Sequence, residues 1–324
     1  MEHVSNIELP ALRKVQITPR RPKLSPTATK IAEGAVAVRE TNPGEEDIAY
    51  LHAVMTQVSL PRRKTAERFF ERRSGNASLR IDAGVIDNGS KYVELPLPYG
   101  PMPRYMLAFL NTFAIRNKTP EIPLGNSARD FMESIGYSVS GGKRGTYTTF
   151  RDQATALAAC RLILTVGDRG VPKTQLKGDI VEEFEAWSDF EGGQRAVWPG
   201  RLVLSEKYYR SLDGSAVPLN HTALKALRGS ALALDIYAWL AHRLHRIRDR
   251  SGTFVSWPSL KQQFGDEYSE DNDGRANFRR EFLRVIHIVK SLYPTARVHE
   301  CTDQRKSCGL TLLCSPPPIA KSDR

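Results

Sequence analysis

Several features that would identify large classes of protein are absent from this sequence of 324 residues. No apolar run approaches the length of about 20 residues that a membrane-spanning helix needs. The first residues, MEHVSNIELPALRK, contain no apolar stretch typical of a secretory signal. There are only four cysteines, which in a chain without an export signal indicates reduced thiols rather than a disulfide framework. The sequence therefore predicts a cytoplasmic protein with no membrane partner.

The motifs of nucleotide-binding proteins are also missing. Gly142-Lys143 suggests a phosphate-binding loop, but that loop needs a glycine five residues before the pair and Ser or Thr directly after the lysine. Tyr137 and Arg144 occupy those two positions. We therefore expect no bound nucleotide, and the glycines need another explanation.

Metal sites and catalytic centres are equally hard to find. Cys301, Cys308 and Cys314 are separated by six and five residues, whereas structural zinc sites usually use closer pairs. Burial of Cys301 and Cys314 on a hairpin is the alternative. The histidines of HRLH, His242 and His245, lack a third ligand, and we expect them at a basic, partly exposed helix end. We expect no metal, no cofactor, no small-molecule substrate and no enzymatic activity.

Positive charge is the first feature that points to a partner. There are 47 Lys and Arg residues against 36 Asp and Glu, which gives a formal net charge of +11. Basic side chains placed on phosphates release condensed counterions, so a polyanion is a natural partner. A merely basic surface is the alternative, and the distribution of the charge has to decide.

The order of expected elements is that of a winged helix, and it occurs twice. In the first segment, helix 103–118 precedes an extended piece at 120–125, a short helix at 126–137, a longer helix at 145–160 and two strands. In the second, helix 230–248 precedes a strand at 252–257, a short helix at 258–265, helix 274–292 and a hairpin over 296–315. Chance similarity between short elements is the alternative.

The predicted fold is therefore α+β, with tandem winged helix-turn-helix domains that arose by duplication. We expect a mostly disordered basic arm over 1–44, a first domain over 45–198, a second over 199–319 and a tail over 320–324. A helix is expected over 45–61, at the start of the first domain.

The two longer helices carry the candidate DNA-contacting residues. In the first, Phe150, Ala154 and Leu157 form the core face, and polar residues form the other face. In the second, the core face contains Phe278, Phe282, Val285 and Val289. Arg, Thr and Lys on the outer faces can reach phosphates and base edges. The candidates, including the tip of the last hairpin, are Lys143, Arg144, Thr146, Thr148, Arg151, Thr155, Arg275, Asn277, Arg279, Arg280, Arg284, His287, Arg305 and Lys306.

One segment argues against this placement. The sequence GDEYSEDNDG, directly before the second helix, is acidic. It could point away from DNA, or it could cap the helix through Asp273.

Long parts of the sequence resemble the core of plasmid-encoded replication initiators of the RepA type. The resemblance rests on LPLPYGPMPRYMLAFLNTFAIRNKTPEIPLGNSARDFMESIGYSVSGGKRGTYTTFRDQATALAACRLIL and on LNHTALKALRGSALALDIYAWLAHRL, and it extends over roughly residues 46–315. It implies binding of directly repeated origin sites (iterons) through two winged-helix domains, with local strand opening. It also implies recruitment of the host initiator and replicative helicase, and autorepression by a homodimer.

Two other classes stay open at this point. A winged-helix transcriptional regulator would bind one inverted repeat at a promoter. A nickase or primase would need a metal or a nucleophile, which the sequence does not offer.

Overall fold

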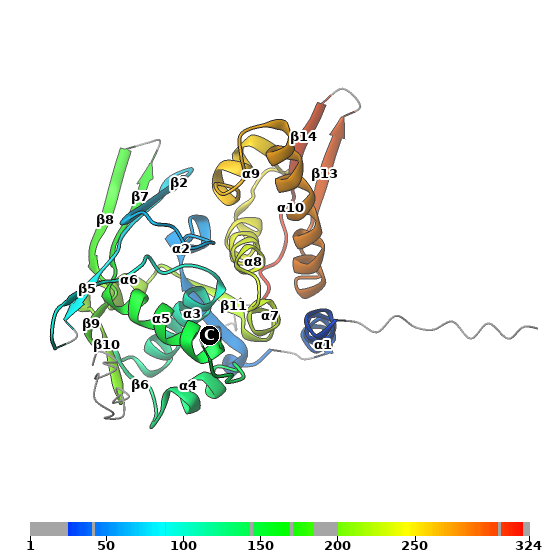
Figure 1. The fold of residues 1–324 in the computed structure, drawn as a ribbon. Helices are drawn as coiled ribbons and strands as arrows, with labels where there is room; N and C mark the ends of the chain where they lie inside the picture. Colours follow the sequence, from blue (N-terminus) through cyan, green and yellow to red (C-terminus); the bar gives the residue numbers. More distant parts are fainter. Residues whose placement is uncertain are drawn as a thin grey trace, which may run out of the picture.

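The fold combines helices with small antiparallel sheets, so the expected α+β class is confirmed. This computed structural model describes residues 25–40, 43–87, 89–142, 145–168, 171–184, 200–303 and 306–319. Figure 1 shows two groups of elements on either side of α2 (Ala53–Gln57) and β11 (Ala216–Asn220). The buried side chains of both groups form one continuous hydrophobic core.

The first group contains the element order expected for its segment. The elements are α3 (Pro101–Asn117), β6 (Glu121–Pro123), α4 (Ala128–Ser134), α5 (Thr146–Ala159), β7 (Arg161–Asp168) and β8 (Val171–Asp179). Local sequence signals determine where these helices begin. α3 begins with prolines, because the first amides of a helix need no intrahelical acceptor. The Ser127 hydroxyl caps α4 by accepting the N–H of Asp130 at 3.0 Å. Both signals are legible in the sequence.

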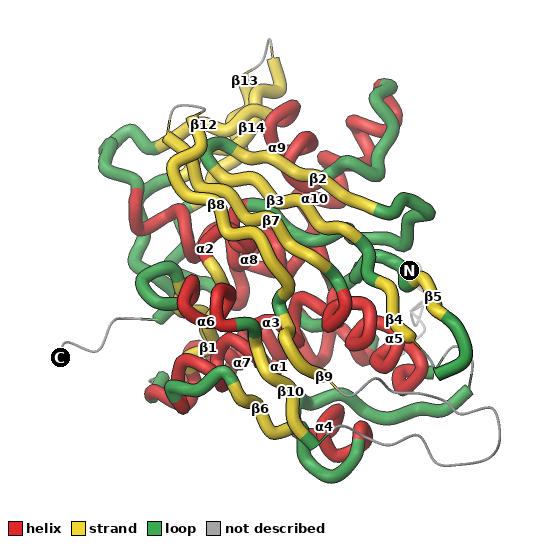
Figure 2. Tube along the Cα trace, turned by 90° about the vertical axis from the view of Figure 1, so that its left-hand side faces the viewer, coloured by secondary structure: helices red, strands yellow, loops and turns green. Residues whose placement is uncertain are grey.

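The sheets of this group include strands from distant parts of the chain. β7 and β8 join β2 (Phe69–Ser74) and β3 (Ala77–Asp82) in a four-stranded sheet of order β2-β3-β7-β8, which Figure 2 shows side by side. β6 pairs instead with β10 (Arg201–Leu204), which pairs with β9 (Val181–Phe184). The strands after α5 are therefore not paired with β6 directly.

The second group also has the expected order. It contains α8 (Ala231–Arg243), the 3-10 helix η2 (Leu244–Arg246), β12 (Thr253–Ser256), α9 (Trp257–Phe264), α10 (Asn272–Leu292), β13 (Val298–Asp303) and β14 (Lys306–Leu312). Here the short strand does join the hairpin, in a sheet of order β12-β14-β13. The order of elements is thus present twice, and the winged-helix assignment of the two segments stays a prediction.

The helix expected over 45–61 is wrong. The structure has a 3-10 helix, η1 (Glu45–Asp47), then β1 (Ile48–His52) and α2. β1 pairs with β11, more than 160 residues further along the chain, and that pairing overrides the local helical preference. β4 (Val85–Asp87) pairs with β5 (Tyr92–Glu94) in a separate two-stranded sheet.

The expected disordered arm is corrected for part of its length. Residues 26–40 form α1 (Pro26–Glu40), which packs on α7 (His221–Leu227) and α10. The packing is close at Gly34, where an added Cβ would lie 2.6 Å from the Cβ of Ala226. Residues 1–24 lie outside the described part of the chain.

The boundary expected at 198–199 stays a prediction. β10 follows it directly and completes the sheet of β6 and β9. The next helix, α6 (Glu206–Leu212), packs against β8 and α3. The elements just after residue 200 therefore pack with the first group.

Candidate nucleic-acid interface

α10 separates its two faces as the sequence predicts. Its inward residues, Phe278, Phe282, Val285 and Val289, are all buried. Phe282 packs edge-on against Trp257 of α9, with ring centroids 5.9 Å apart. Packing of this kind fixes the rotation of the helix about its axis, so the residues between the core positions must face solvent. Asn277, Arg280, Arg284 and His287 are exposed, as expected.

The arginines of α10 differ in what holds them. Arg279 donates to Glu300 of β13 at 2.7 Å and lies over the Trp257 ring, 5.5 Å from its centroid. Arg284 donates to Glu281 at 2.7 Å, and this bond lowers the pKa of that carboxyl. Arg280 donates to the amide oxygen of Asn277 and, within the described residues, forms no ion pair. Of Arg279, Arg280 and Arg284, Arg280 is thus the one most available to an external anion.

Most carboxylates of the acidic segment before α10 have partners within the protein. Asp271 is the N-cap of the helix, and its carboxylate accepts the N–H of Gly274 at 2.6 Å. That bond lowers the pKa of Asp271. The expectation that Asp273 caps the helix is therefore wrong: Asp273 lies too far inside, in the helical first turn.

Hydrogen bonds from threonine hydroxyls stabilise the glycine-rich turn before α5. Thr146 donates to the carbonyl of Ser138 at 2.7 Å and accepts the N–H of Ser140 at 2.8 Å. Thr148 donates to the carbonyl of Gly142 at 2.9 Å. Gly142 has a backbone φ of 92°, a conformation that residues with a Cβ atom rarely adopt. The hydroxyl bonds therefore stabilise the turn from within, and Lys143 and Arg144 lie outside the described residues.

The solvent-facing side of α5 includes fewer residues than the sequence predicts. Arg151 is half-buried and forms an ion pair with Asp152 at 3.6 Å. The outward position of Thr155 is wrong, because Thr155 is 7% exposed and its hydroxyl donates to the carbonyl of Arg151. The second half of α5 is buried on several sides, including Gln153, which accepts the N–H of Tyr99 at 2.7 Å.

The remaining candidates belong to the second group. Arg275 is exposed in the first turn of α10. Lys306 begins β14 in register with Asp303, and Arg305 lies outside the described residues.

The exposure of the histidines and cysteines differs in part from what the sequence predicts. Within the described residues there is no cluster of His, Cys, Asp and Glu that could hold a metal ion. Cys301 is half-buried and Cys314 is exposed, so the expected burial of Cys314 is wrong. His245 is exposed, but His242 is buried, and burial together with Arg246 lowers its pKa to about 3.

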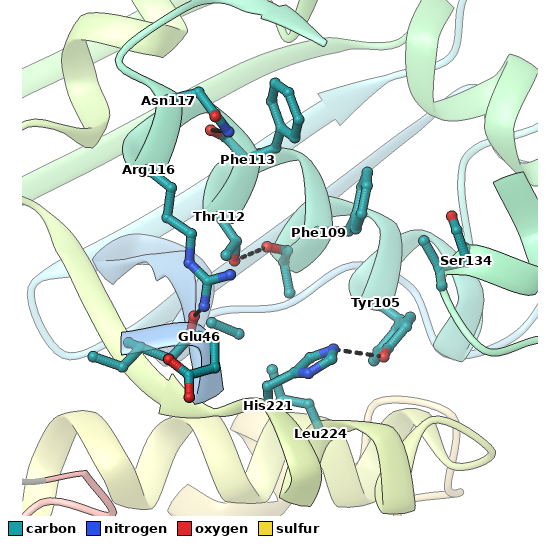
Figure 3. A pocket seen from close by; sticks show the side chains of 14 residues that line it. Glu46, Tyr105, Phe109, Thr112, Phe113, Arg116, Asn117, Ser134, His221 and Leu224 are labelled. Carbon is teal, nitrogen blue, oxygen red and sulfur yellow. Dashed lines mark hydrogen bonds between the residues drawn. The ribbon is translucent and has the colours of Figure 1, made fainter. Parts of the chain in front are cut away.

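A cavity of about 190 Å³ lies between α3, β1, α4 and α7, and Figure 3 shows its lining. Most of the lining is apolar, and several of its polar side chains form hydrogen bonds within the protein. Tyr105 and His221 form a 3.3 Å hydrogen bond, and Arg116 donates to the carbonyls of Glu45 and Ile48. Burial lowers the pKa of His221. These groups hold α3 against α7 and β1 rather than presenting a nucleophile beside a base.

None of the helices in the described part of the chain has the length and apolar character that crossing a membrane requires. No curated protein matches the chain. Among solved structures, a selenomethionine derivative of domains 2 and 3 of RctB is similar at 13% sequence identity and a TM-score of 0.47. The similarity covers 81% of this chain and 97% of that one.

The family described as "Plasmid encoded RepA protein" matches residues 97–259. The match begins just before α3, continues through α5 and ends within the first turn of α9. It extends over half of the chain and includes most of the two sequence stretches that carry the resemblance. The chain belongs to the plasmid-encoded RepA family of plasmid replication proteins.

Proposed function

We propose that this protein initiates plasmid replication by binding double-stranded DNA at the plasmid origin through directly repeated sites. The observation that carries the proposal is the outer face of α10. Asn277, Arg280 and His287 lie exposed along a helix whose other face is fixed in the core. Amide and guanidinium groups in such a row can form hydrogen bonds with base edges in the major groove, and Arg can bind guanine through two bonds.

Each of the two segments would act as a winged helix. The repeated order of elements supports this interpretation, as does the sheet β12-β14-β13, which joins the short strand to a hairpin. In the second segment α10 would lie in the major groove and the β13–β14 hairpin over the phosphates. In the first, α5 would occupy the next groove through residues 143–151, which include its own first helical residues.

The proposed contacts are those predicted from the sequence, without Thr155. Family membership and the formal net charge of +11 support DNA as the partner. After binding, the protein would open the origin locally and recruit the host initiator and replicative helicase. Repression of its own gene by a homodimer is part of the same proposal.

DNase footprinting on the DNA around the gene, at physiological salt, tests the proposal. We expect protection of several evenly spaced direct repeats, each about two helical turns long. Protection of one inverted repeat at the promoter would instead identify a transcriptional regulator. Incubation of supercoiled plasmid with the protein and Mg²⁺ should give no nicked product, and nicking would contradict a role without catalysis.

The assignment of α10 has its own test. Arg280→Ala should weaken specific binding by about 1–3 kcal/mol if the side chain reads a base. Arg210→Ala on α6, where the exposed Arg210 pairs with Glu206, is the matched control. Wild-type affinity in Arg280→Ala would remove this side chain from the interface.

A further inference from the structure

The first residue of a short basic run in the first group of elements contacts the loop before α10. Arg62, Arg63 and Lys64 follow α2 and precede β2, so they belong to the first group by sequence. The guanidinium of Arg62 nevertheless pairs with Glu267, in the loop before α10. It also lies over the ring of Tyr268, 5.8 Å from the centroid. The run thus crosses from one group of elements to the other.

Further contacts fix this position. Tyr268 packs edge-on against Phe278 of α10, with ring centroids 5.6 Å apart, so Arg62 is joined to α10 through one intervening ring. Arg72 of β2 donates to Asp266 at 2.5 Å, and its own side chain is 3% exposed. Gln263 of α9 donates to the carbonyl of Gln57 at 2.7 Å. Because residues on both sides of the run are held, the run itself has little freedom to move away from α10.

Contacts of the same kind reduce the objection raised by the acidic sequence before α10, since three of its carboxylates are paired. Asp266 pairs with Arg72, Glu267 with Arg62, and Glu270 with Lys261 at 2.5 Å. Asp271 is the helix cap. Carboxylates already paired with cations repel an approaching polyanion far less than free ones. The acidic loop is therefore a bridge to the first group rather than a barrier to DNA.

Arg63 and Lys64 differ from Arg62 in facing solvent. Both are exposed, and the described residues contain no ion pair for either. Consecutive Cα atoms are about 3.8 Å apart, so the Lys64 Cα lies within about 7.6 Å of that of Arg62. Two exposed cations thus follow directly after an arginine that is joined to α10 through Tyr268.

We propose that Arg63 and Lys64 bind DNA phosphates next to the groove occupied by α10, so that the DNA interface of the second winged helix is completed by residues of the first. This inference rests on the proposed function of α10. Long basic side chains without internal partners are suited to phosphates, which they bind without reading sequence. Neutralising a phosphate releases counterions, so each such ion pair adds to the salt dependence of binding.

The test is the slope of log K against log salt concentration, measured by fluorescence anisotropy with a duplex that contains the footprinted site and with a scrambled duplex. In the double variant Arg63→Ala/Lys64→Ala, we expect the slope to decrease by about 0.9 for each phosphate that is no longer neutralised, on both duplexes. Arg63→Lys/Lys64→Arg keeps both charges and should keep the slope. The matched control is Lys207→Ala/Lys225→Ala, which removes two exposed charges from α6 and α7.

The outcomes separate this inference from the proposed function. A smaller slope in the double alanine variant but not in the control supports the inference. An unchanged slope in that variant, while Arg280→Ala weakens specific binding, overturns the inference and leaves α10 as a reading helix. If neither variant alters binding, α10 is outside the interface, and the inference fails together with that assignment. Equal decreases in the double variant and the control also overturn it, because total charge rather than position then accounts for the effect.

Discussion

At the scale of single residues, His52 makes stability depend on pH. His52 ends β1 and caps α2, and its Nδ1 accepts the N–H of Val54 at 3.2 Å. The side chain is buried, and burial lowers its pKa to about 4 from the usual 6.5. An unfolded chain takes up this proton near pH 6.5 and the folded chain only near pH 4. The free energy of unfolding should therefore fall by about 3 kcal/mol as pH drops from 6.5 to 4.

Substitution of His52 by Asn checks this prediction. Asn is also a good N-cap, so His52→Asn keeps the local hydrogen bond to α2 but cannot titrate. Urea unfolding at pH 7 and pH 4.5 should give a smaller loss of stability in the variant than in the wild type. His299→Asn, at an exposed histidine of β13, is the control. If His52→Asn loses as much stability on acidification as the wild type, the acid sensitivity originates elsewhere.

Residue positions can be predicted where one periodic pattern decides them. The period of α10 places Phe278 and Phe282 in the core, and that of α5 places Phe150 there, as the structure confirms. The prediction for Thr155 is wrong because α5 is covered on more than one side near its end, which a helical wheel does not reveal. The prediction for Cys314 is wrong because this residue lies beyond the last paired residue of β14, where strand alternation no longer applies.

At the scale of elements, the cap of α10 gives a paired prediction. Asp271 accepts the N–H of Gly274, whereas Asp273 lies within the first turn and is not the cap. Asp271→Ala should lower the free energy of unfolding by about 1 kcal/mol, because an amide at the helix start loses its acceptor. Asp273→Ala removes the same charge two residues away and should cost less. Chemical denaturation of both variants at pH 7 measures the difference, and equal losses would mean that charge rather than the cap matters.

Elements with strong local signals are the ones that the sequence predicts. Prolines at the start of α3, Ser127 at the start of α4 and the long period of α10 each determine an element within one stretch of chain. β1 has no such signal, since its strand state depends on β11. α1 is also poorly signalled, because its helix is stabilised by packing on α7 and α10 rather than by its own weak amphipathic pattern.

At the scale of the whole molecule, the sequence predicts the basic charge and the repeated order of elements. It does not predict the contacts that join the two groups. β10 completes a sheet with β6, about 80 residues earlier, and loop 266–267 pairs with Arg62 and Arg72. Each of these interactions depends on the arrangement of elements that are far apart in the chain. Local patterns in the sequence contain no information on such pairings.

The buried pair Arg104–Asp235 shows how strongly the two groups depend on each other. Arg104 of α3 donates from Nε to Asp235 of α8 at 2.7 Å, and both side chains are almost fully buried. Ser59 adds a 2.9 Å bond to the same carboxylate. Asp235→Ala leaves a buried guanidinium without its counter-charge, which should lower the free energy of unfolding by about 3–5 kcal/mol.

Urea unfolding followed by circular dichroism measures this loss, with Asp213→Ala at an exposed position after α6 as the control. Because one continuous core contains residues of both groups, the wild type should unfold in a single transition, and Asp235→Ala should shift that transition to lower urea. A loss below about 1 kcal/mol would mean that water or the backbone carbonyls around Arg104 replace the carboxylate. A second, separate transition in the variant alone would mean that this pair, more than the shared core, makes the two groups unfold together.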